Sequence, residues 1–333
     1  MIGYQKRRKP TLIGSSECIK EVKRKIEEAS SSDMPVLIRG ETGVGKEITA
    51  KLIHLASGRK RGPFVVVSCP GLLPSLARSE LFGHERGAYT GADKRRIGKF
   101  EEAEGGTIFL DEIADLNPEV QAMVLRAVEK GEIERLGGKE RIKVNVRVIA
   151  ATNKDIEKLI EDDYFRKDLY YRLIGHVIHI PPLRKRKEDI PELIDHFISL
   201  YSLGKPPVIS KEVLNELLSY DWPGNVRELE MMIRRICEVH GGRRVGIEEL
   251  GDMGLWREEG LRVKMPSQFN LKEEVKRLKR KLIMLALSET RGNISKAAEM
   301  LGISRQGLSK MMKNLGIKKG GNDVDGGGNV VTI

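Results

Sequence analysis

The sequence predicts three folded parts: an α/β domain built on a parallel sheet with flanking helices, an all-α subdomain, and a basic C-terminal helical domain. Three observations support this fold class. Short β-branched runs alternate with helix-like stretches in the first half of the chain, an order typical of a parallel sheet buried between helices. After Pro181 and Pro182 the apolar period becomes helical. The C-terminal part carries most of the net positive charge.

The expected elements follow in order along the chain. Four β-branched runs predict strands at 36–38, 64–67, 107–110 and 146–150. The spacing of Ile190, Leu193, Ile194 and Phe197 predicts the first helix of the all-α subdomain. The expected segments are a basic tail (1–11), the α/β domain (12–182), the helical subdomain (183–246), a linker (247–270), the C-terminal domain (271–318) and a disordered tail (319–333).

The composition excludes some classes of protein. With 333 residues, of which 40% are hydrophobic and 32% charged, the chain is expected to be a soluble protein of several domains. No stretch approaches the roughly 18 consecutive apolar residues of a membrane span, so we expect a cytoplasmic protein without a membrane partner. Aromatic residues make up only 5% of the chain, which argues against binding by base stacking.

The positive charge is concentrated near the C-terminus. Residues 271–320 contain 13 Lys and Arg but only 4 Asp and Glu, a net charge of +9 out of +11 for the whole chain. Neutralising the phosphates of nucleic acid releases condensed counterions, so a compact basic unit indicates nucleic-acid binding. A merely solvated basic face is the alternative.

A glycine-rich loop follows the first predicted strand and leads into a helix. Its glycines allow backbone N–H groups to surround phosphates, and its lysine neutralises the β and γ phosphates, so the segment predicts ATP binding. The residue after the lysine is Glu47, where the general motif has Ser or Thr for Mg²⁺. The expected nucleotide contacts here are Gly40, Glu41, Thr42, Gly43, Val44, Gly45, Lys46 and Glu47.

The rest of this site comes from strand ends and from the helical subdomain. Asp111 ends an apolar strand and is expected to bind Mg²⁺, and Glu112 is expected to polarise the attacking water as a general base. Asn153 follows the next strand, where it can sense the γ-phosphate. Arg227, in the run Trp-Pro-Gly-Asn-Val-Arg, is expected to close over the nucleotide.

One segment resembles a single protein family. Residues 80–92, Glu-Leu-Phe-Gly-His-Glu-Arg-Gly-Ala-Tyr-Thr-Gly-Ala, are similar to the GAFTGA loop and its lead-in in the AAA+ domain of bacterial activators of sigma-54 RNA polymerase. The resemblance covers about 12–240 and again about 271–317. It implies an AAA+ α/β domain with a helical lid, and sigma-factor contact by Gly87, Ala88, Tyr89, Thr90, Gly91 and Ala92. From the residues alone, this loop is a mobile contact arm or a surface turn.

The same resemblance implies further roles. Arg166 and Arg172 match the positions that reach the nucleotide of a neighbouring subunit, which implies a ring of six or seven subunits. Residues 131–138 are similar to the second pore-side loop, and Ile13 and Gly14 to the segment that lines the adenine.

Three departures from the family pattern are visible. Tyr89 replaces the phenylalanine of the loop, and Ser68 replaces an asparagine that restrains the catalytic glutamate. Only about eleven residues precede the ATPase region, which leaves no room for the N-terminal regulatory domain that is common in this family. The chain is then controlled by a separate partner, ungated, or a fragment of a longer protein.

The C-terminal segment 293–310 resembles the Fis-type helix-turn-helix. Ala297, Leu301 and Leu308 have the spacing to pack two helices across a turn at Gly302. The preceding helix, 271–287, is expected to form a dimer contact. The residues expected to face the major groove and the phosphates are Arg305, Gln306, Ser309, Lys310 and Lys313.

These patterns predict an ATP-hydrolysing transcription activator. It is expected to bind double-stranded DNA upstream of promoters as a dimer that assembles into a ring, and to remodel sigma-54 RNA polymerase from closed to open complexes. Two alternatives belong to other classes: a DNA-binding repressor switched by nucleotide, and an AAA+ DNA motor. The motor would not need the loop at 87–92, and the repressor would not need a catalytic carboxylate.

Overall fold

The computed structural model describes residues 10–71, 74–89, 92–202, 204–247, 249, 271–290 and 292–317. The predicted tail at 319–333 and most of the predicted N-terminal tail and linker therefore lie outside the described residues. The chain divides into two compact units, Met1–Arg257 and Glu258–Ile333, and each has a core of its own. Within the described residues, no helix is both long enough and apolar enough to cross a membrane.

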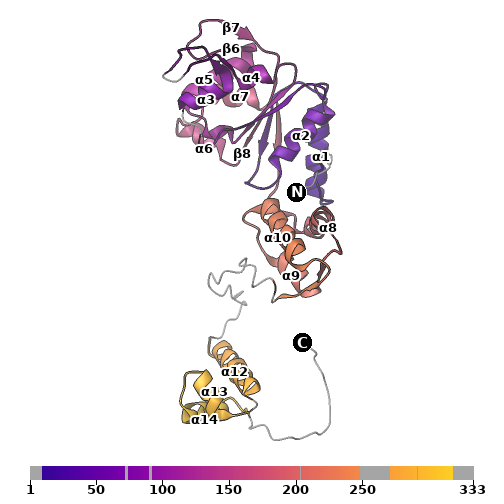
Figure 1. The fold of residues 1–333 in the computed structure, drawn as a ribbon, viewed down its shortest axis with the longest axis vertical. Coiled ribbons are helices and arrows are strands. Elements are labelled where there is room, and N and C mark those ends of the chain that lie inside the picture. The colour runs from indigo at the N-terminus through magenta and orange to yellow at the C-terminus, as the bar shows by residue number, and fades with distance from the viewer. Residues whose placement is uncertain are drawn as a thin grey trace. The chain divides into compact units, whose positions relative to one another are not determined.

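A five-stranded sheet forms the centre of the first unit (Figure 1). Its strand order is β2-β5-β8-β1-β9, and every neighbouring pair is parallel. The strands are β1 (Val36–Arg39), β2 (Phe64–Ser68), β5 (Thr107–Asp111), β8 (Arg147–Thr152) and β9 (His176–His179). The predicted parallel sheet is confirmed. Its fifth strand, β9, was not predicted, because a histidine at each end leaves it only two apolar residues.

Helices cover both faces of this sheet, since successive side chains of a strand point to opposite faces. Leu37, Ile108 and Ala150 belong to one core, whereas their neighbours Phe109 and Ile149 belong to the other. The first core packs against α3 (Pro74–Phe82), α4 (Lys99–Glu102), α5 (Pro118–Lys130), α6 (Ile156–Glu161) and α7 (Lys167–Leu173), and the second against α1 (Glu17–Ser30) and α2 (Lys46–Ala56). Burial on both faces explains why the strands are apolar without alternation.

Short elements connect these layers. A short 3-10 turn, η1 (Ile113–Asp115), follows β5. Two antiparallel strand pairs lie outside the main sheet: β3 (Gly83–His84) with β4 (Arg96–Ile97), and β6 (Glu132–Glu134) with β7 (Arg141–Lys143). Two further 3-10 turns, η2 (Leu183–Lys185) and η3 (Lys187–Asp189), lead into the helical subdomain.

The helical subdomain packs around Trp222, which is fully buried and donates its indole N–H to the Leu217 carbonyl at 2.8 Å. Its helices are α8 (Ile190–Tyr201), α9 (Lys211–Ser219) and α10 (Asn225–His240). One two-residue parallel pair, β10 (Val208–Ile209) with β11 (Arg244–Val245), supplies the only strands among the subdomain's described residues.

The second unit is a three-helix domain made of α12 (Leu271–Glu289), α13 (Ile294–Met300) and α14 (Arg305–Asn314). Ala297, Leu308 and Met312 are buried between them, and Gly302 makes the turn in the left-handed region at φ +62°. Ser304 caps α14 by accepting the Gly307 N–H at 3.1 Å. The predicted helix-turn-helix is confirmed.

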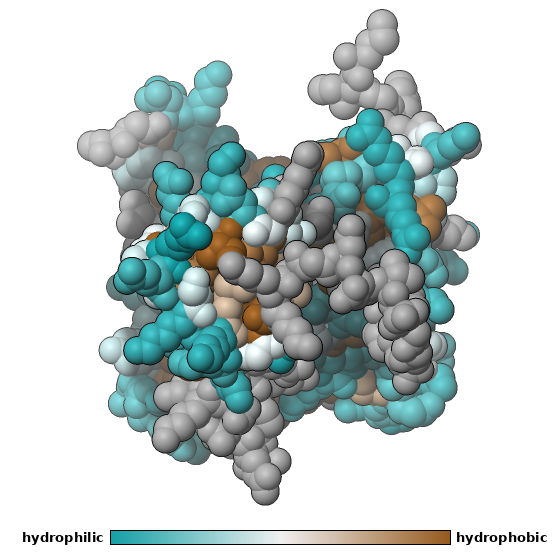
Figure 2. Space-filling model, turned by 90° about the horizontal axis from the view of Figure 1, so that it is seen from below, coloured by the Kyte–Doolittle hydropathy of each residue, from teal (hydrophilic) through white to brown (hydrophobic). Residues whose placement is uncertain are grey.

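Seen from below, the described surface is mostly hydrophilic, with apolar residues gathered in a small area (Figure 2).

Candidate functional site

The glycine-rich loop lies between β1 and α2, at the carboxyl edge of the sheet. Gly43 and Gly45 adopt φ values of +82° and +108°, a region that favours glycine. A side chain at residue 43 would also collide with the lid, because its Cβ would lie 2.2 Å from the Gly224 carbonyl oxygen. The loop therefore approaches the lid backbone closely, and the first-turn N–H groups of α2 lie where an anion can bind.

Lys46 and Glu112 face each other beside this loop. The Lys46 ammonium lies 2.8 Å from one Glu112 carboxylate oxygen and donates to the Gly40 carbonyl at 2.9 Å. Only 6% of the Lys46 side chain is exposed. The second Glu112 oxygen accepts the Asn153 backbone N–H at 2.7 Å, and the Asn153 side chain donates to the Thr42 hydroxyl at 3.0 Å. These four residues thus form one hydrogen-bonded chain between the loop and the strand ends.

The backbone conformation of Glu112 and the residues around it bear on its role. Glu112 adopts φ +54°, a left-handed conformation that is rare for a residue with a side chain and is typical of functional sites. Ser68, at the position where the family pattern has asparagine, is exposed at the end of β2. Among the described residues, the contacts that hold the Glu112 carboxylate come from Lys46 and Asn153.

Asp111 ends β5, next to Glu112. Burial raises the pKa of its carboxyl, the Glu112 charge raises this pKa further, and the Lys46 ammonium opposes both effects. A half-buried carboxylate crowded by a second carboxylate is the kind of oxygen ligand that a divalent cation stabilises. The donor set at this edge therefore fits Mg²⁺.

A cavity of about 480 Å³ joins these groups. It is lined by nine of the predicted site residues: Thr42, Gly43, Gly45, Lys46, Glu47, Asp111, Glu112, Asn153 and Arg227. Ile13 lines a neighbouring cavity of about 220 Å³. Gly14 has φ +134°, and its carbonyl accepts a hydrogen bond from the Lys23 ammonium at 2.7 Å.

Lid residues that the sequence did not single out contact the loop directly. Arg184 forms two hydrogen bonds to the Glu41 carboxylate, at 2.6 and 2.7 Å, and this pairing lowers the pKa of Glu41 to about 2. The fully buried Asn225 donates to Glu41 and to the Thr42 carbonyl, both at 3.1 Å. Arg227 donates its backbone N–H to the Gly43 carbonyl at 3.2 Å. The run Trp-Pro-Gly-Asn-Val-Arg, which pointed to Arg227, also contains Asn225.

The two arginines that resemble trans-acting groups do not line the cavity that Lys46, Asp111 and Glu112 share in their own chain. Arg166 forms two hydrogen bonds with Asp168, at 3.0 and 2.7 Å, and Arg172 pairs with Glu129. Both side chains are about half exposed, 42% and 55%. Each arginine is therefore held by a carboxylate at the surface, where another subunit can be reached.

The loop resembling the family's sigma-factor contact begins at Gly87, which has φ +81°. Two backbone hydrogen bonds close the loop. The Gly87 N–H donates to the Ala92 carbonyl at 2.9 Å, and the Ala92 N–H donates to the Tyr89 carbonyl at 3.0 Å. The Tyr89 ring is 41% exposed and packs edge-on against His84, with ring centroids 5.2 Å apart. Thr90 and Gly91 lie outside the described residues.

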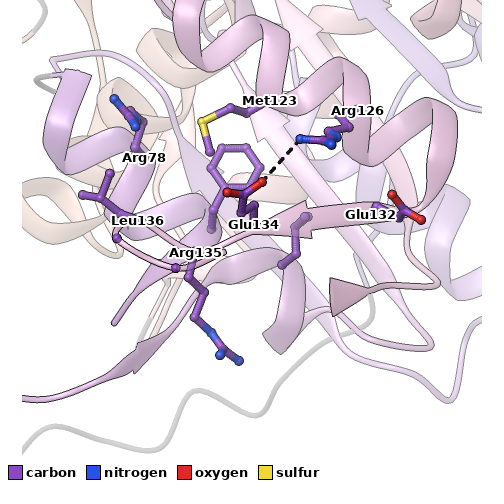
Figure 3. Close-up of a pocket in the computed structure, with 11 residues that line it drawn as sticks. Arg78, Met123, Arg126, Glu132, Glu134, Arg135 and Leu136 are labelled. Carbon is purple, nitrogen blue, oxygen red and sulfur yellow. Dashed lines mark hydrogen bonds and ion pairs between the residues drawn. The ribbon is translucent and has the colours of Figure 1, made fainter. Parts of the chain in front are cut away.

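Residues 131–138, which are similar to the family's second pore-side loop, lie beside the segment that begins at Gly87. Arg135, which follows β6, donates to Glu101 at 2.9 Å and to Glu85 at 2.8 Å. A side chain at Gly137 would lie 2.8 Å from the Ala88 side chain, so the two loops are in close contact. A cavity of about 340 Å³ lies under this hairpin, where Arg126 reaches Glu134 at 3.5 Å (Figure 3).

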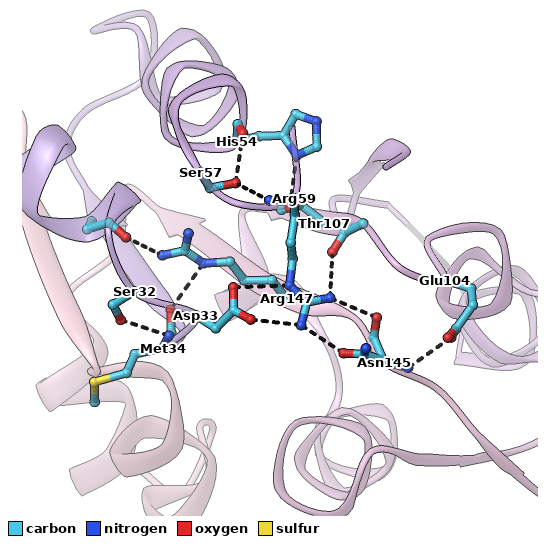
Figure 4. Close-up of polar contacts among 12 residues, drawn as sticks. Ser32, Asp33, Met34, His54, Ser57, Arg59, Glu104, Thr107, Asn145 and Arg147 are labelled. Atoms are coloured by element: carbon cyan, nitrogen blue, oxygen red, sulfur yellow. Dashed lines mark hydrogen bonds and ion pairs between the residues drawn. The ribbon is translucent and has the colours of Figure 1, made fainter. Parts of the chain in front are cut away.

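A polar cluster lies at the other edge of the sheet, where β8 begins (Figure 4). The buried Arg147 donates to the Ala29 carbonyl at 2.6 Å and to the Met34 carbonyl at 3.3 Å. Arg59 bonds both oxygens of Asp33, at 3.0 and 3.1 Å. These bonds join the end of α1 to the sheet, so we assign this cluster to structure.

The predicted DNA-contacting residues share one face of α14. Arg305, Gln306, Ser309, Lys310 and Lys313 are all exposed, whereas Leu308 and Met312, on a different face, are buried. Their spacing of four residues places them on adjacent turns. The helix thus presents three cations and two polar groups to solvent.

The fold and site together define a P-loop AAA+ nucleotide-binding domain joined to a helix-turn-helix domain. Comparison with known proteins agrees with each part. Residues 12–180 match the model of the sigma-54 interaction domain, residues 184–259 that of the AAA+ ATPase lid domain, and residues 275–315 that of the bacterial regulatory proteins of the Fis family.

Individual relatives span most of the chain. It is 40% identical to the DNA-binding transcriptional regulator NtrC of Azospirillum brasilense, over 92% of this chain and 70% of that protein. It is 41% identical to ZraR of Salmonella typhimurium, over 89% of this chain and 67% of that protein. It is 43% identical to a signal-transduction and transcriptional-control protein of Clostridium beijerinckii, over 92% of this chain and 49% of that protein.

Among solved structures, NtrX of Brucella abortus in complex with ADP superposes with a TM-score of 0.70 and 33% identity, covering 92% of this chain and 70% of that one. Its complex with ATP gives the same TM-score at 32% identity. The chain belongs to the family of sigma-54-dependent transcriptional activators, with an AAA+ ATPase domain and a Fis-type DNA-binding domain.

Proposed function

We propose that this chain hydrolyses Mg²⁺-ATP in a ring of six or seven subunits and uses the loop at 87–92 to remodel sigma-54 RNA polymerase at promoters. The proposed working parts are the α/β domain at 12–182, the lid at 183–246 and the DNA-binding domain at 271–318. The observation that carries the proposal is the single cavity lined by Lys46, Asp111 and Glu112.

The hydrolysis step is assigned to groups on these strand ends and loops. Glu112 accepts a proton from a water molecule, whose oxygen attacks the γ-phosphorus as the bond to ADP breaks. Lys46 neutralises the phosphates, and when it does so it releases the Glu112 carboxylate that it holds at 2.8 Å. Asp111 would hold Mg²⁺, which supplies charge stabilisation to the phosphates.

Two further groups would respond to the nucleotide. Asn153, which bonds both Thr42 and Glu112, would sense the γ-phosphate. Arg227 lines the cavity from the lid and would close over the nucleotide. Arg166 and Arg172 would leave their surface carboxylates to reach the nucleotide of the next subunit, which makes the ring a requirement of catalysis.

The site predicts that ATP binding and hydrolysis can be separated by mutation. Lys46→Ala should abolish measurable ATP binding, because it removes the cation that neutralises the phosphates. Glu112→Gln should bind ATP but stop turnover, because an amide cannot accept the proton of water. Calorimetry and phosphate release measure the two steps. Hydrolysis by Glu112→Gln at the parental rate would show that another group is the base, and a chain without any phosphate release would favour the nucleotide-switched repressor.

A second prediction concerns DNA. Deleting residues 271–333 should abolish specific DNA binding and leave ATPase activity, because the first unit has its own cores. Binding by the intact chain should weaken steeply with salt, since contacts to phosphates release counterions. Arg305→Ala should reduce discrimination between sites, whereas Lys313→Ala should weaken binding to all sequences about equally. Filter binding at several salt concentrations measures both effects, and full operator binding by the deletion would place the DNA site elsewhere.

A further inference from the structure

The side chain of Tyr89 meets one aromatic ring among the described residues. Its ring centroid lies 5.2 Å from that of His84, at an interplanar angle of 64°, an edge-to-face arrangement that aromatic rings favour. The backbone hydrogen bonds of Gly87 and Ala92 close the loop, but they constrain the main chain and leave the direction of the Tyr89 side chain open. The contact with His84 therefore sets the direction of this ring.

His84 is itself held in one orientation. It is only 7% exposed, and its Nδ1 lies 2.8 Å from the hydroxyl oxygen of Ser79, a buried residue of α3. Buried polar groups of this kind are normally hydrogen-bonded. Because the hydrogen bond reaches a ring atom, it fixes the rotation of the imidazole, so the ring that faces Tyr89 does not turn freely.

The backbone of His84 is joined to residues 131–138. His84 and Leu136 form a parallel bridge, with two backbone hydrogen bonds of 3.0 Å between Leu136 and the chain neighbours of His84. A movement of residues 131–138 therefore displaces His84 as well. Through His84, this second loop is connected to the ring of Tyr89.

A ring that is held before binding loses less conformational freedom when a partner docks, so the partner binds more tightly. Tyr89 is partly exposed, which leaves some of its ring free for a partner while another part lies against His84. We propose that His84 is a positioning residue for the sigma-factor contact, because it holds the Tyr89 ring in the orientation that the sigma factor meets. This inference rests on the proposed function.

Two substitutions at His84 separate its ring from its hydrogen bond. His84→Asn removes the ring but carries an amide near the position of Nδ1, which can still bond the Ser79 hydroxyl. With ADP and aluminium fluoride, it should bind sigma-54 about 2- to 10-fold more weakly than the wild type, the effect of losing one aromatic edge contact. His84→Phe restores a ring without the hydrogen bond and should recover most of this loss. Fluorescence anisotropy of labelled sigma-54 measures the affinity, and ATP hydrolysis shows whether each variant is folded.

His54→Asn is the matched control. His54 is also buried, its Nδ1 lies 3.0 Å from the Thr107 hydroxyl oxygen, and its ring centroid lies 5.2 Å from that of Phe64. It lies on α2, which packs on the opposite face of the sheet from α3. The substitution therefore removes the same kinds of contact away from the loop, and sigma-54 should bind this variant as it binds the wild type.

A fluorine label at residue 89 tests the ring contact without the sigma factor. In the full chain with 3-fluorotyrosine at this position, His84→Asn should move the fluorine resonance toward that of the free amino acid, whereas His54→Asn should leave it unchanged. If His84→Asn does not fold, His84→Gln, which also lacks the ring, replaces it.

Three results would overturn the proposal: a fluorine resonance that His84→Asn leaves unchanged, wild-type affinity of His84→Asn for sigma-54, or a His84→Phe variant that binds as weakly as His84→Asn. Failure of the wild type to bind sigma-54, with the resonance shifted in His84→Asn, would instead overturn the proposed function.

Discussion

Replacing Arg172 by alanine should reduce ATP hydrolysis by about 10³- to 10⁵-fold, the effect of losing an arginine finger in well-studied systems, and should leave ATP binding largely intact. The physical reason is that Arg172 lies outside the cavity of its own chain, paired with Glu129, and would act on the nucleotide of a neighbour. Arg166→Ala should behave similarly. Phosphate release at saturating ATP measures the loss.

Mixed rings test whether the arginine acts in trans. Subunits carrying Arg172→Ala should regain hydrolysis when mixed with Glu112→Gln subunits, because some interfaces then contain both the arginine and the base. Lys167→Ala removes an exposed cation from the same helix and should hydrolyse ATP normally. If mixing restores nothing in rings whose assembly has been verified, the arginine does not act between subunits.

Replacing Tyr89 by alanine should abolish open-complex formation on a sigma-54 promoter without loss of ATP hydrolysis or operator binding. Tyr89 is 41% exposed, and among the described residues no contact links it to the nucleotide cavity. Removing the ring therefore removes the contact and leaves the ATPase site unchanged. Thr90→Ala should have the same phenotype.

Tyr89→Phe is the matched control, because it keeps the ring and removes only the hydroxyl; it should remain active. The wild type should also bind sigma-54 most tightly with ADP and aluminium fluoride, which mimics the transition state. Normal transcription by Tyr89→Ala, or sigma-54 binding that does not depend on nucleotide, would mean that the loop is only a surface turn. Strand separation on duplex DNA without polymerase would favour the DNA motor.

Much of the architecture could be predicted from the sequence because its signals are local. The strands β1, β2, β5 and β8 are runs of apolar, mostly β-branched residues, and their alternation with helices is enough to predict a parallel sheet. β9 escaped prediction because only its neighbours in the sheet identify it as a strand. The phosphate loop and Asp111 are recognisable because their chemistry requires particular residues at fixed spacing.

The parts that could not be predicted depend on contacts between distant residues. Arg184 lies 143 positions from Glu41, and Arg186 lies 142 positions from Val44, so no local pattern relates them. The contacts of Glu112 with Lys46 and Asn153 also arise only when three strand ends meet at one edge of the sheet. Folding alone brings these groups together.

The backbone contact between Arg227 and Gly43 provides a built-in reporter of lid motion. Arg227 is the third residue of α10, and amides in the first turn of a helix have no acceptor within that helix. Its N–H is instead bonded to the phosphate loop at 3.2 Å. Exchange of this hydrogen with deuterium therefore requires the lid to separate from the loop, so its rate measures how often the nucleotide site opens, independently of whether ATP is being hydrolysed.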